Sequence, residues 1–227
     1  MLKAVPTGVP GLDEILGGGF PKNKLILLAG GPGAGKTIMA AQFLYSGATK
    51  YGEKGVYVSF AETAESFKEE MKILGMDFDE LEKKGLVKVI DLITTVKPAL
   101  DANLTTIVEN VETLKAERLV IDSFAAMTNA VREKIEVRVI AHLLQKFLLR
   151  LGCTTILITE IPWSRTVIGT GVEEFISDGV IMIEPIIERG ELKRRLLVLK
   201  MRGVSTSRQY HEVSIDSHGV TLIPTTL

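Results

Sequence analysis

The chain lacks the features that would tie it to an oxidising compartment or to a membrane. Among its 227 residues, the one cysteine, Cys153, has no partner for an internal disulfide, and its place at the start of an apolar run favours a buried structural thiol. No apolar run approaches the length of a membrane span, and residues 1–15 contain Asp13 and Glu14 but no apolar signal core. We therefore expect a cytoplasmic protein without membrane contact.

An excess of charge of either sign is also missing. The 27 basic and 28 acidic residues leave a net charge of −1, whereas a protein built mainly to coat nucleic acid is usually basic. Hydrophobic residues make up 46% of the sequence, which is typical of a globular protein, and the length suits one α/β domain over residues 1–227. We see no linker, repeat or low-complexity segment that would divide it.

The sequence does contain a complete phosphate-binding motif. Residues Gly30–Thr37 match the pattern G-x-x-x-x-G-K-[ST], and they stand between a predicted strand at 24–29 and a predicted helix at 37–44. This order directs free backbone N–H groups and the positive end of the helix dipole at one point. A glycine-rich turn between core elements would not explain the Lys36-Thr37 pair at this spacing. The predicted nucleotide contacts are Gly31, Pro32, Gly33, Ala34, Gly35, Lys36, Thr37 and Ile38.

Strand and helix patterns alternate after this motif. Strands are predicted at 55–60, 86–91, 118–122 and 153–159, and helices at 64–74, 100–116 and 133–151. Such alternation predicts a mostly parallel, twisted sheet covered by helices on both faces. From residue 178 the predicted strands follow one another without helices, at 178–184, 195–200, 209–215 and 220–223, which indicates an antiparallel extension of the sheet.

Two acidic residues are candidates for the rest of a nucleotide site. A phosphate-binding loop needs a carboxylate that orients Mg²⁺ with the Thr37 hydroxyl, and Asp122, at the end of a buried strand, fits this role. A lone Asp at a strand end is usually a turn former, but the upstream motif favours the metal site. Glu62 follows the strand at 55–60, where its carboxylate would orient the water that attacks the phosphate. A favourable charge at the N-terminus of the helix near residue 64 explains the presence of Glu62 equally well.

Two basic residues near the end of the chain form a third candidate group. Lys200 and Arg202 are two apart on an extended segment, so their side chains are predicted to point to one face. Two neighbouring cations repel one another unless an anion lies between them, and a phosphate is such an anion. The alternative is a solvated edge strand that its positive charge protects from aggregation, as the run Lys193-Arg194-Arg195 suggests.

These residues resemble the KaiC-like branch of the RecA-type ATPases, and the resemblance covers nearly the whole chain. Besides the loop, it is carried by five blocks in family order: 7–21, Ser59-Phe60 with Glu62, 119–123, 171–178 and 199–203. The resemblance implies a RecA-type P-loop fold, ATP and Mg²⁺, and an oligomeric ring, commonly hexameric, with ATP at subunit interfaces. It also implies that Lys200 and Arg202 reach the γ-phosphate of the neighbouring subunit's nucleotide.

The sequence departs from the family pattern in three places. The family has two adjacent glutamates after the second strand, and the first is the usual catalytic base; here Ala61 takes that position and Glu62 remains. Val204 and Thr206 stand where clock proteins of this family carry a threonine and a histidine. Glu174-Phe175 replaces their phosphorylated Ser-Thr pair, and the chain has one such domain rather than two, so we expect no autokinase activity.

Three functions follow from these observations. The first is an ATP-binding, ATP-hydrolysing regulator that assembles with itself, in which Lys36, Glu62, Lys200 and Arg202 act on the phosphates or the water. The second is a RadA-like accessory protein that binds single-stranded DNA through Trp163 and Arg165, where packing or subunit contact is the favoured alternative. The third is a scaffold that binds ATP without hydrolysing it, and Ala61 favours this reading. Glu160 ends the strand at 153–159 and is a further candidate for sensing phosphate.

Overall fold

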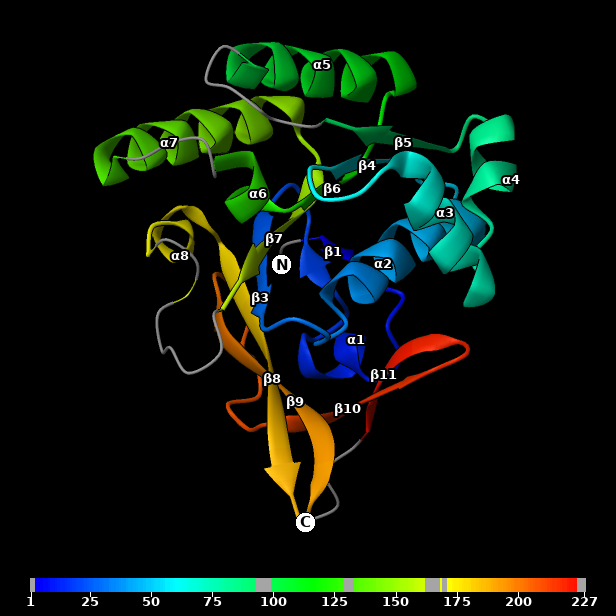
Figure 1. The fold of residues 1–227 in the computed structure, drawn as a ribbon, viewed down its shortest axis with the longest axis vertical. Coiled ribbons are helices and arrows are strands. Elements are labelled where there is room, and N and C mark those ends of the chain that lie inside the picture. The colour runs from blue at the N-terminus through cyan, green and yellow to red at the C-terminus, as the bar shows by residue number, and fades with distance from the viewer. Residues whose placement is uncertain (1–2, 93–98, 129–132, 162–167, 169–170, 224–227) are drawn as a thin grey trace.

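The computed structural model describes residues 3–92, 99–128, 133–161, 168 and 171–223, and a nine-stranded sheet with helices on both faces dominates it (Figure 1). The helices are α1 (Leu12–Ile15), α2 (Lys36–Tyr51), α3 (Ala64–Ile73), α4 (Phe78–Lys83), α5 (Ala99–Leu114), α6 (Phe124–Thr128), α7 (Lys134–Leu151) and α8 (Glu173–Ile176). The strands of the large sheet are β3 (Leu25–Gly30), β4 (Gly55–Ser59), β5 (Val87–Asp91), β6 (Arg118–Asp122), β7 (Thr154–Glu160), β8 (Gly179–Glu188), β9 (Glu191–Met201), β10 (His211–Asp216) and β11 (Gly219–Ile223). A separate pair joins β1 (Ala4–Val5) to β2 (Phe20–Pro21).

The strand order of the large sheet is β11-β10-β9-β8-β3-β7-β6-β4-β5. The neighbouring strands in the series β8-β3-β7-β6-β4-β5 pair in parallel. The neighbouring strands in the series β8-β9-β10-β11 pair antiparallel. The predicted mostly parallel sheet with an antiparallel C-terminal extension is therefore confirmed. Because parallel strands share their direction, the carboxyl ends of β3, β4, β6 and β7 meet at one edge, where ligands bind in such sheets.

Apolar side chains on the two faces of the sheet form two core layers. Ile26 and Leu28 pack with α2, α3 and α4 on one face, while Leu25 and Leu27 pack with α5, α6 and α7 on the other. This alternation follows from the two-residue period of a strand. Each fully buried Leu or Ile contributes roughly 1.5–3 kcal/mol, so the continuous apolar runs that predicted these strands also explain the sheet's central place.

The helices differ from the predicted ones mainly in length and number. The helix after the phosphate-binding motif runs on to Tyr51 rather than ending near residue 44, and the short helix α4 was not predicted. Asp77 begins α4 because its carboxylate accepts a hydrogen bond from the Glu80 N–H at 3.0 Å. In the described part of the chain, no helix combines the length and the apolar character needed to cross a membrane.

Candidate functional site

The glycine-rich loop connects the end of β3 to the start of α2. Gly33 and Gly35 have φ angles of 70° and 91°, which side-chain-bearing residues rarely adopt. Gly35 immediately precedes α2, and no side chain caps the helix, so its first N–H groups remain open to a ligand. A Cβ on Gly35 would lie 2.5 Å from Cδ1 of Ile215, so a larger residue is excluded there by space as well as by conformation.

Lys36 folds back over the loop. Its Nζ atom donates hydrogen bonds of 2.9 Å to the carbonyl oxygens of both Gly30 and Gly31. Burial lowers the pKa of this ammonium group, and the negative charges of Asp122 and Glu160 oppose that shift. The cation therefore lies against the start of the loop, at the carboxyl end of β3.

The Thr37 hydroxyl donates a 2.7 Å hydrogen bond to Oδ2 of Asp122. Asp122 is buried at the end of β6, as its strand predicted, and the Tyr57 phenol from β4 donates a second hydrogen bond of 2.8 Å to the same oxygen. Burial raises the pKa of Tyr57 well above its ordinary value, and the neighbouring Asp122 charge raises it further, so the phenol stays protonated. Two hydroxyl donors thus hold the same carboxylate oxygen.

Glu62 lies in the turn between β4 and α3. The Ser59 hydroxyl accepts hydrogen bonds from the N–H groups of Ala61 and Glu62 and donates one of 2.7 Å to the Glu62 carbonyl, which defines this turn. Burial, Glu70 and Asp122 raise the pKa of the Glu62 carboxyl, in that order of size. Asp122 therefore acts electrostatically on Glu62, the carboxylate of this turn. Ala61, which is exposed, brings no functional group.

Lys200 and Arg202 lie near each other but away from the loop of their own chain. Lys200 pairs with Val180, which stands opposite Leu27, whereas the loop begins at Gly30. That offset is about 10 Å along the strands, and β9 lies two strands of about 4.8 Å from β3. The Lys200 ammonium donates to the carbonyls of Glu174 and Ser177 at 3.0 and 2.6 Å.

The anion beside this pair is a carboxylate of the same chain. Arg202 Nη1 lies 3.8 Å from Oδ1 of Asp178, and the Arg202 side chain is 56% exposed. Burial lowers the pKa of Lys200, and the Arg202 charge lowers it further. The structure therefore brings Lys36, Thr37, Asp122 and Glu62 together in one chain and leaves Lys200 and Arg202 outside that group.

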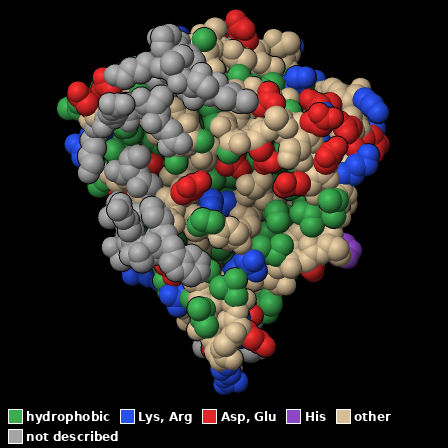
Figure 2. Space-filling view, viewed as in Figure 1, with side chains coloured by type: hydrophobic (Ala, Val, Ile, Leu, Met, Phe, Trp, Pro, Cys, Tyr) green, Lys and Arg blue, Asp and Glu red, His purple; other side chains and the backbone are tan. Residues whose placement is uncertain are grey.

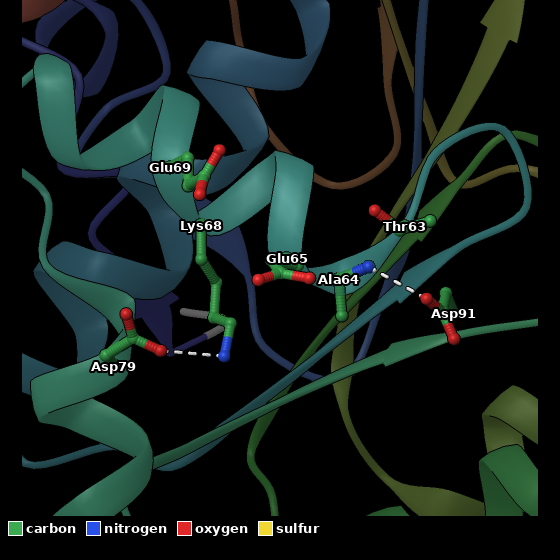
Figure 3. A pocket seen from close by; sticks show the side chains of 7 residues that line it. All are labelled: Thr63, Ala64, Glu65, Lys68, Glu69, Asp79 and Asp91. Atoms are coloured by element: carbon green, nitrogen blue, oxygen red, sulfur yellow. Dashed lines mark hydrogen bonds and ion pairs between the residues drawn. The ribbon is translucent and has the colours of Figure 1, made fainter.

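Beside Glu62, the start of α3 borders an open acidic hollow (Figure 3). In it, the Ala64 N–H donates a 2.9 Å hydrogen bond to Asp91, and Lys68 forms a 2.7 Å ion pair with Asp79. The residues around the hollow are Thr63, Ala64, Glu65, Lys68, Glu69, Asp79 and Asp91. None of them belongs to the phosphate-binding loop, so the hollow is a surface next to the site rather than the site itself.

Comparison with known proteins identifies the family of this chain. Residues 5–226 match the family model described as "ATPase: KaiC". The chain belongs to the KaiC ATPase family. A UPF0273 protein of Thermotoga maritima is 35% identical over 239 residues, which cover 99% of this chain and 97% of that protein. A UPF0273 protein of Pyrococcus horikoshii is 36% identical with similar coverage, 99% and 95%.

A solved relative confirms the fold of this KaiC-family chain. The crystal structure of a KaiC-like protein from Pyrococcus horikoshii OT3 superposes with a TM-score of 0.92 at 38% sequence identity, covering 99% of this chain and all of that one. The RecA-type fold is thus shown, and with it an ATP-binding protein of the RecA/KaiC type. The resemblance stated from the motifs is confirmed across nearly the full length.

The sequence assigns no role in the candidate site to three residues that contact it, although Ser59 stands in one of the blocks that carry the family resemblance. Tyr57 looked like an ordinary core residue of a strand, yet its hydroxyl contacts Asp122. Ser59 organises the Glu62 turn. Arg194 from β9 donates a 3.0 Å hydrogen bond to the Gly33 carbonyl in the loop, although its basic run had suggested a solvated edge. A polar group inside an apolar strand was the available signal for Tyr57; no local pattern marks Arg194.

Some predicted residues stand apart from this KaiC-type group. Trp163 and Arg165, on which the DNA-binding alternative rests, lie outside the described residues. Glu160 is exposed at the end of β7 and opposes, through its charge, the lowered pKa of Lys36, so it lies within electrostatic range of the loop. Phe175, at the position of the clock phosphorylation pair, is 70% exposed on α8.

Proposed function

We propose that this chain, as one domain over residues 1–227, hydrolyses ATP slowly at a site that a second copy completes, and that assembly thereby regulates turnover. The observation that carries the proposal is the 2.7 Å contact between Thr37 and Asp122 next to the Lys36 ammonium. A hydroxyl, a carboxylate and a cation meet there at the open end of α2. This is the donor set that a nucleoside triphosphate with its divalent ion requires.

The residues present fit a magnesium ion. Mg²⁺ prefers hard oxygen ligands, and the Thr37 hydroxyl and the Asp122 carboxylate provide two that already adjoin one another. The second hydrogen bond to Oδ2, from Tyr57, holds the carboxylate in place. Thr37 and Asp122 would hold the ion, which supplies neutralising charge to the phosphate oxygens.

The loop supplies the phosphate contacts. The backbone N–H groups of Gly31 and of residues 33–38 line the loop and the first turn of α2, while Pro32 has none to donate. The left-handed conformation of Gly33 and Gly35 shapes this backbone. The Lys36 ammonium, which here donates to two loop carbonyls, is placed to exchange those bonds for phosphate oxygens. Arg194 fixes the Gly33 carbonyl on the outer side of the loop and so supports its shape.

Glu62 is the proposed base that orients and deprotonates water. Its raised pKa brings it closer to the working pH of a general base than an ordinary carboxylate. The absence of the family's first glutamate supports slow turnover, because Ala61 offers no carboxylate. The second candidate, a scaffold that binds ATP without turnover, rests on the same residue and differs only in the role of Glu62.

Lys200 and Arg202 complete the site from a neighbouring copy. Within one chain they lie on the side of α8, three strand positions away from the loop. A cation that arrives in trans and stabilises the transition-state charge contributes roughly 10³–10⁵ in rate. The self-assembly of this chain, as a ring of six for example, would therefore control hydrolysis without a change at the loop.

A mixing experiment tests the proposal. Lys36→Ala removes the phosphate contact of its own loop but retains Arg202, and Arg202→Ala does the reverse. Each variant alone should release little phosphate from ATP in the presence of Mg²⁺. The mixture should recover a measurable part of the native rate, because an Arg202→Ala loop can receive Arg202 from a Lys36→Ala neighbour. Mixtures that stay as inactive as the separate variants, while the native chain is active, contradict a site shared between copies.

Glu62→Gln separates the two candidate functions. If the chain hydrolyses ATP with Glu62 as base, this variant binds a fluorescent ATP analogue as the native chain does but releases phosphate at least tenfold more slowly. If the native chain, Glu62→Gln and Arg202→Ala all match the Lys36→Ala background, the chain is the non-hydrolysing scaffold.

A further inference from the structure

An extra residue in β9 turns Lys200 to one particular face of the sheet. Val180 pairs with Lys200, but Ile181 pairs with Val198, so Leu199 is a bulge between them. Regular alternation would place Lys200 on the face of Val198, which packs with α2, α3 and α4. The bulge places it opposite Val180 instead, on the face that α5, α6 and α7 cover. Bulges commonly redirect a side chain in this way near functional sites.

The turn between α8 and β8 holds both C-terminal cations. The Lys200 ammonium donates to the carbonyls of Glu174 and Ser177 in this turn. The Arg202 backbone N–H donates a 2.9 Å hydrogen bond to the Asp178 carbonyl, and the Asp178 carboxylate lies 3.8 Å from the Arg202 guanidinium. The turn therefore supports both side chains that the proposed function assigns to a neighbouring nucleotide.

Asp178 is fixed against the start of the central strand. Its backbone N–H donates a 2.8 Å hydrogen bond to the Leu25 carbonyl, and its Oδ2 accepts one of 3.3 Å from the Leu25 N–H. Its Oδ1 lies 3.3 Å from the Lys24 ammonium. Leu25 begins β3, the strand that leads into the phosphate-binding loop. The position of the carboxylate is therefore set by the same strand that carries the loop.

Asp178 is a buried carboxylate among cations. Figure 2 shows Asp and Glu side chains gathered over the surface of α3 and α4, whereas the Asp178 side chain is only 11% exposed. A carboxylate with so little contact with water requires cations that offset its desolvation, and Lys24 and Arg202 provide them. The Asp178 charge also opposes the burial that lowers the pKa of Lys200. Three cations around one carboxylate leave the group positive, so it still attracts an anion from outside.

The Arg202 guanidinium is held at one end and open at the other. Nη1 faces Oδ1 of Asp178; within the described ranges, Nε and Nη2 make no ion pair or hydrogen bond, and the side chain is 56% exposed. The 3.8 Å separation exceeds the length of a hydrogen bond, so Asp178 attracts the guanidinium through its charge. Because a guanidinium has several donors in a planar fork, this attraction leaves a face free for a phosphate.

We propose that Asp178 is a positioning residue for the site between copies, whose anchored carboxylate orients the Arg202 guanidinium of its own chain toward a neighbour's nucleotide. This role rests on the proposed function, which assigns Arg202 to the neighbouring site. Asp178 acts through Arg202 and needs no contact with the nucleotide. A long arginine side chain loses conformational freedom when it is held for catalysis, and a fixed counter-charge restricts it in advance.

Asp178→Asn tests this role with little change of shape. The amide keeps an oxygen acceptor for the Leu25 N–H but removes the charge that attracts Arg202. Misplacement of a catalytic group by about 1 Å costs on the order of a hundredfold in rate, and the whole cation in trans contributes roughly 10³–10⁵. Phosphate release from ATP with Mg²⁺ should therefore fall about tenfold to a hundredfold. A fluorescent ATP analogue should bind with native affinity, because the loop is unchanged.

Mixtures of variants locate the defect in the copy that donates Arg202. When Lys36→Ala is mixed with Arg202→Ala, the intact loops receive Arg202 from the Lys36→Ala copies. Adding Asp178→Asn to the Lys36→Ala chain should lower the recovered rate about tenfold or more. Asp178→Asn mixed with Lys36→Ala itself should recover activity, because its intact loop then receives a correctly held Arg202. A residue that only stabilises the fold would weaken both mixtures alike.

A second test asks whether Asp178 acts through any other residue. Asp178→Asn combined with Arg202→Ala should release phosphate as Arg202→Ala does, since the carboxylate has nothing left to orient. Glu188→Gln is the matched control: it removes a carboxylate from the 2.8 Å pair with Lys193, at the far end of β8 and β9, and should donate Arg202 as the native chain does. Melting temperatures and the mass in solution show that each variant folds and assembles.

Asp178→Glu keeps the charge on a longer side chain. It should lose less activity as a donor of Arg202 than Asp178→Asn does. If the asparagine variant melts below the assay temperature, Asp178→Glu takes its place in both mixtures, and a loss confined to the donor mixture is again expected.

The outcomes separate this inference from the proposed function. A folded Asp178→Asn chain that donates Arg202 as the native chain does, or that loses activity equally in both mixtures, overturns the positioning role. If Lys36→Ala and Arg202→Ala recover activity together, the proposed function stands even then. A mixture of those two variants that stays inactive contradicts both the shared site and the positioning role.

Discussion

The Tyr57 phenol donates a 2.8 Å hydrogen bond to Oδ2 of Asp122, the oxygen that the Thr37 hydroxyl also contacts. Tyr57 is fully buried, and its ring stacks on Phe67 of α3 with 3.9 Å between ring centroids. The carboxylate at the end of β6 is therefore held by a side chain whose own position the core fixes. A proposed metal ligand with so rigid a support loses little conformational entropy when it binds an ion.

Tyr57→Phe should weaken the response to Mg²⁺ while leaving the fold intact. The phenylalanine ring keeps the stack on Phe67 but removes the hydrogen bond that orients Asp122. Loss of such a supporting partner typically costs about 10–100-fold in metal affinity. The Mg²⁺ concentration that gives half-maximal binding of a fluorescent ATP analogue should rise by that factor.

A matched change elsewhere in the core checks this result. Phe67→Leu disturbs the stack without removing the hydroxyl, so its melting temperature should fall while its Mg²⁺ requirement changes less than that of Tyr57→Phe. An unchanged Mg²⁺ requirement in Tyr57→Phe would show that Thr37 alone orients the carboxylate.

The pH dependence of hydrolysis should report Glu62. A base acts when deprotonated, so activity falls as pH drops through its pKa. Burial and the nearby negative charges of Glu70 and Asp122 raise that pKa, which places the acid limb of kcat/KM above the ordinary range of a glutamate. Glu70→Gln removes one of these charges, so it should move the limb to lower pH and preserve activity in acid. A limb that does not move in Glu70→Gln would assign it to another group.

The sequence identified those parts of the site that local spacing encodes. The loop residues lie within eight positions, and Asp122 ends an unbroken apolar strand, so both follow from the pattern alone. The alternation of strands and helices likewise predicted the parallel sheet. Helix α4 was not predicted because its six residues are too few to show the spacing of apolar residues that marks a helix.

Long-range contacts were the part that could not be predicted. Arg118 begins β6 and is fully buried, because Gly47 has no side chain in the space that its guanidinium fills and Glu53 neutralises its charge. Both residues are far from Arg118 in the sequence. Arg194 reaches the loop across 161 positions. Such pairs depend on how distant elements pack, and no periodicity in a single segment records that.

Breaking the Arg118–Glu53 pair should destabilise the fold strongly. Arg118 Nη2 lies 2.6 Å from Glu53 Oε2, Nε donates to the same oxygen at 2.7 Å, and Nη1 donates to the carbonyls of Pro6 and Phe43. Glu53→Ala leaves a buried guanidinium without its counter-charge, which typically costs about 3–5 kcal/mol. Urea unfolding should show this loss of stability.

A surface ion pair provides the matched control. Glu117→Ala removes a carboxylate from the 3.7 Å surface pair with Lys22 and should cost less than about 1 kcal/mol. Equal losses of stability in the two variants would contradict a special role for burial.

Cys153 should react with thiol reagents only after the chain unfolds. Cys153 immediately precedes β7, and its side chain is 2% exposed. Its Sγ atom lies 3.1 Å from the carbonyl oxygen of Ala116. Burial raises the pKa of the thiol to about 11, so almost none of it is thiolate near neutral pH, and the thiolate is the reactive form. Alkylation by iodoacetamide should be at least tenfold slower in the folded chain than in urea, where exposure and an ordinary pKa both return.

A change of the neighbouring charge is the control. Glu117→Gln should leave alkylation of the folded chain slow, because burial rather than the Glu117 charge is the larger cause of the raised thiol pKa. Rapid alkylation of the folded native chain would show that the strand end opens far more often than its packing implies.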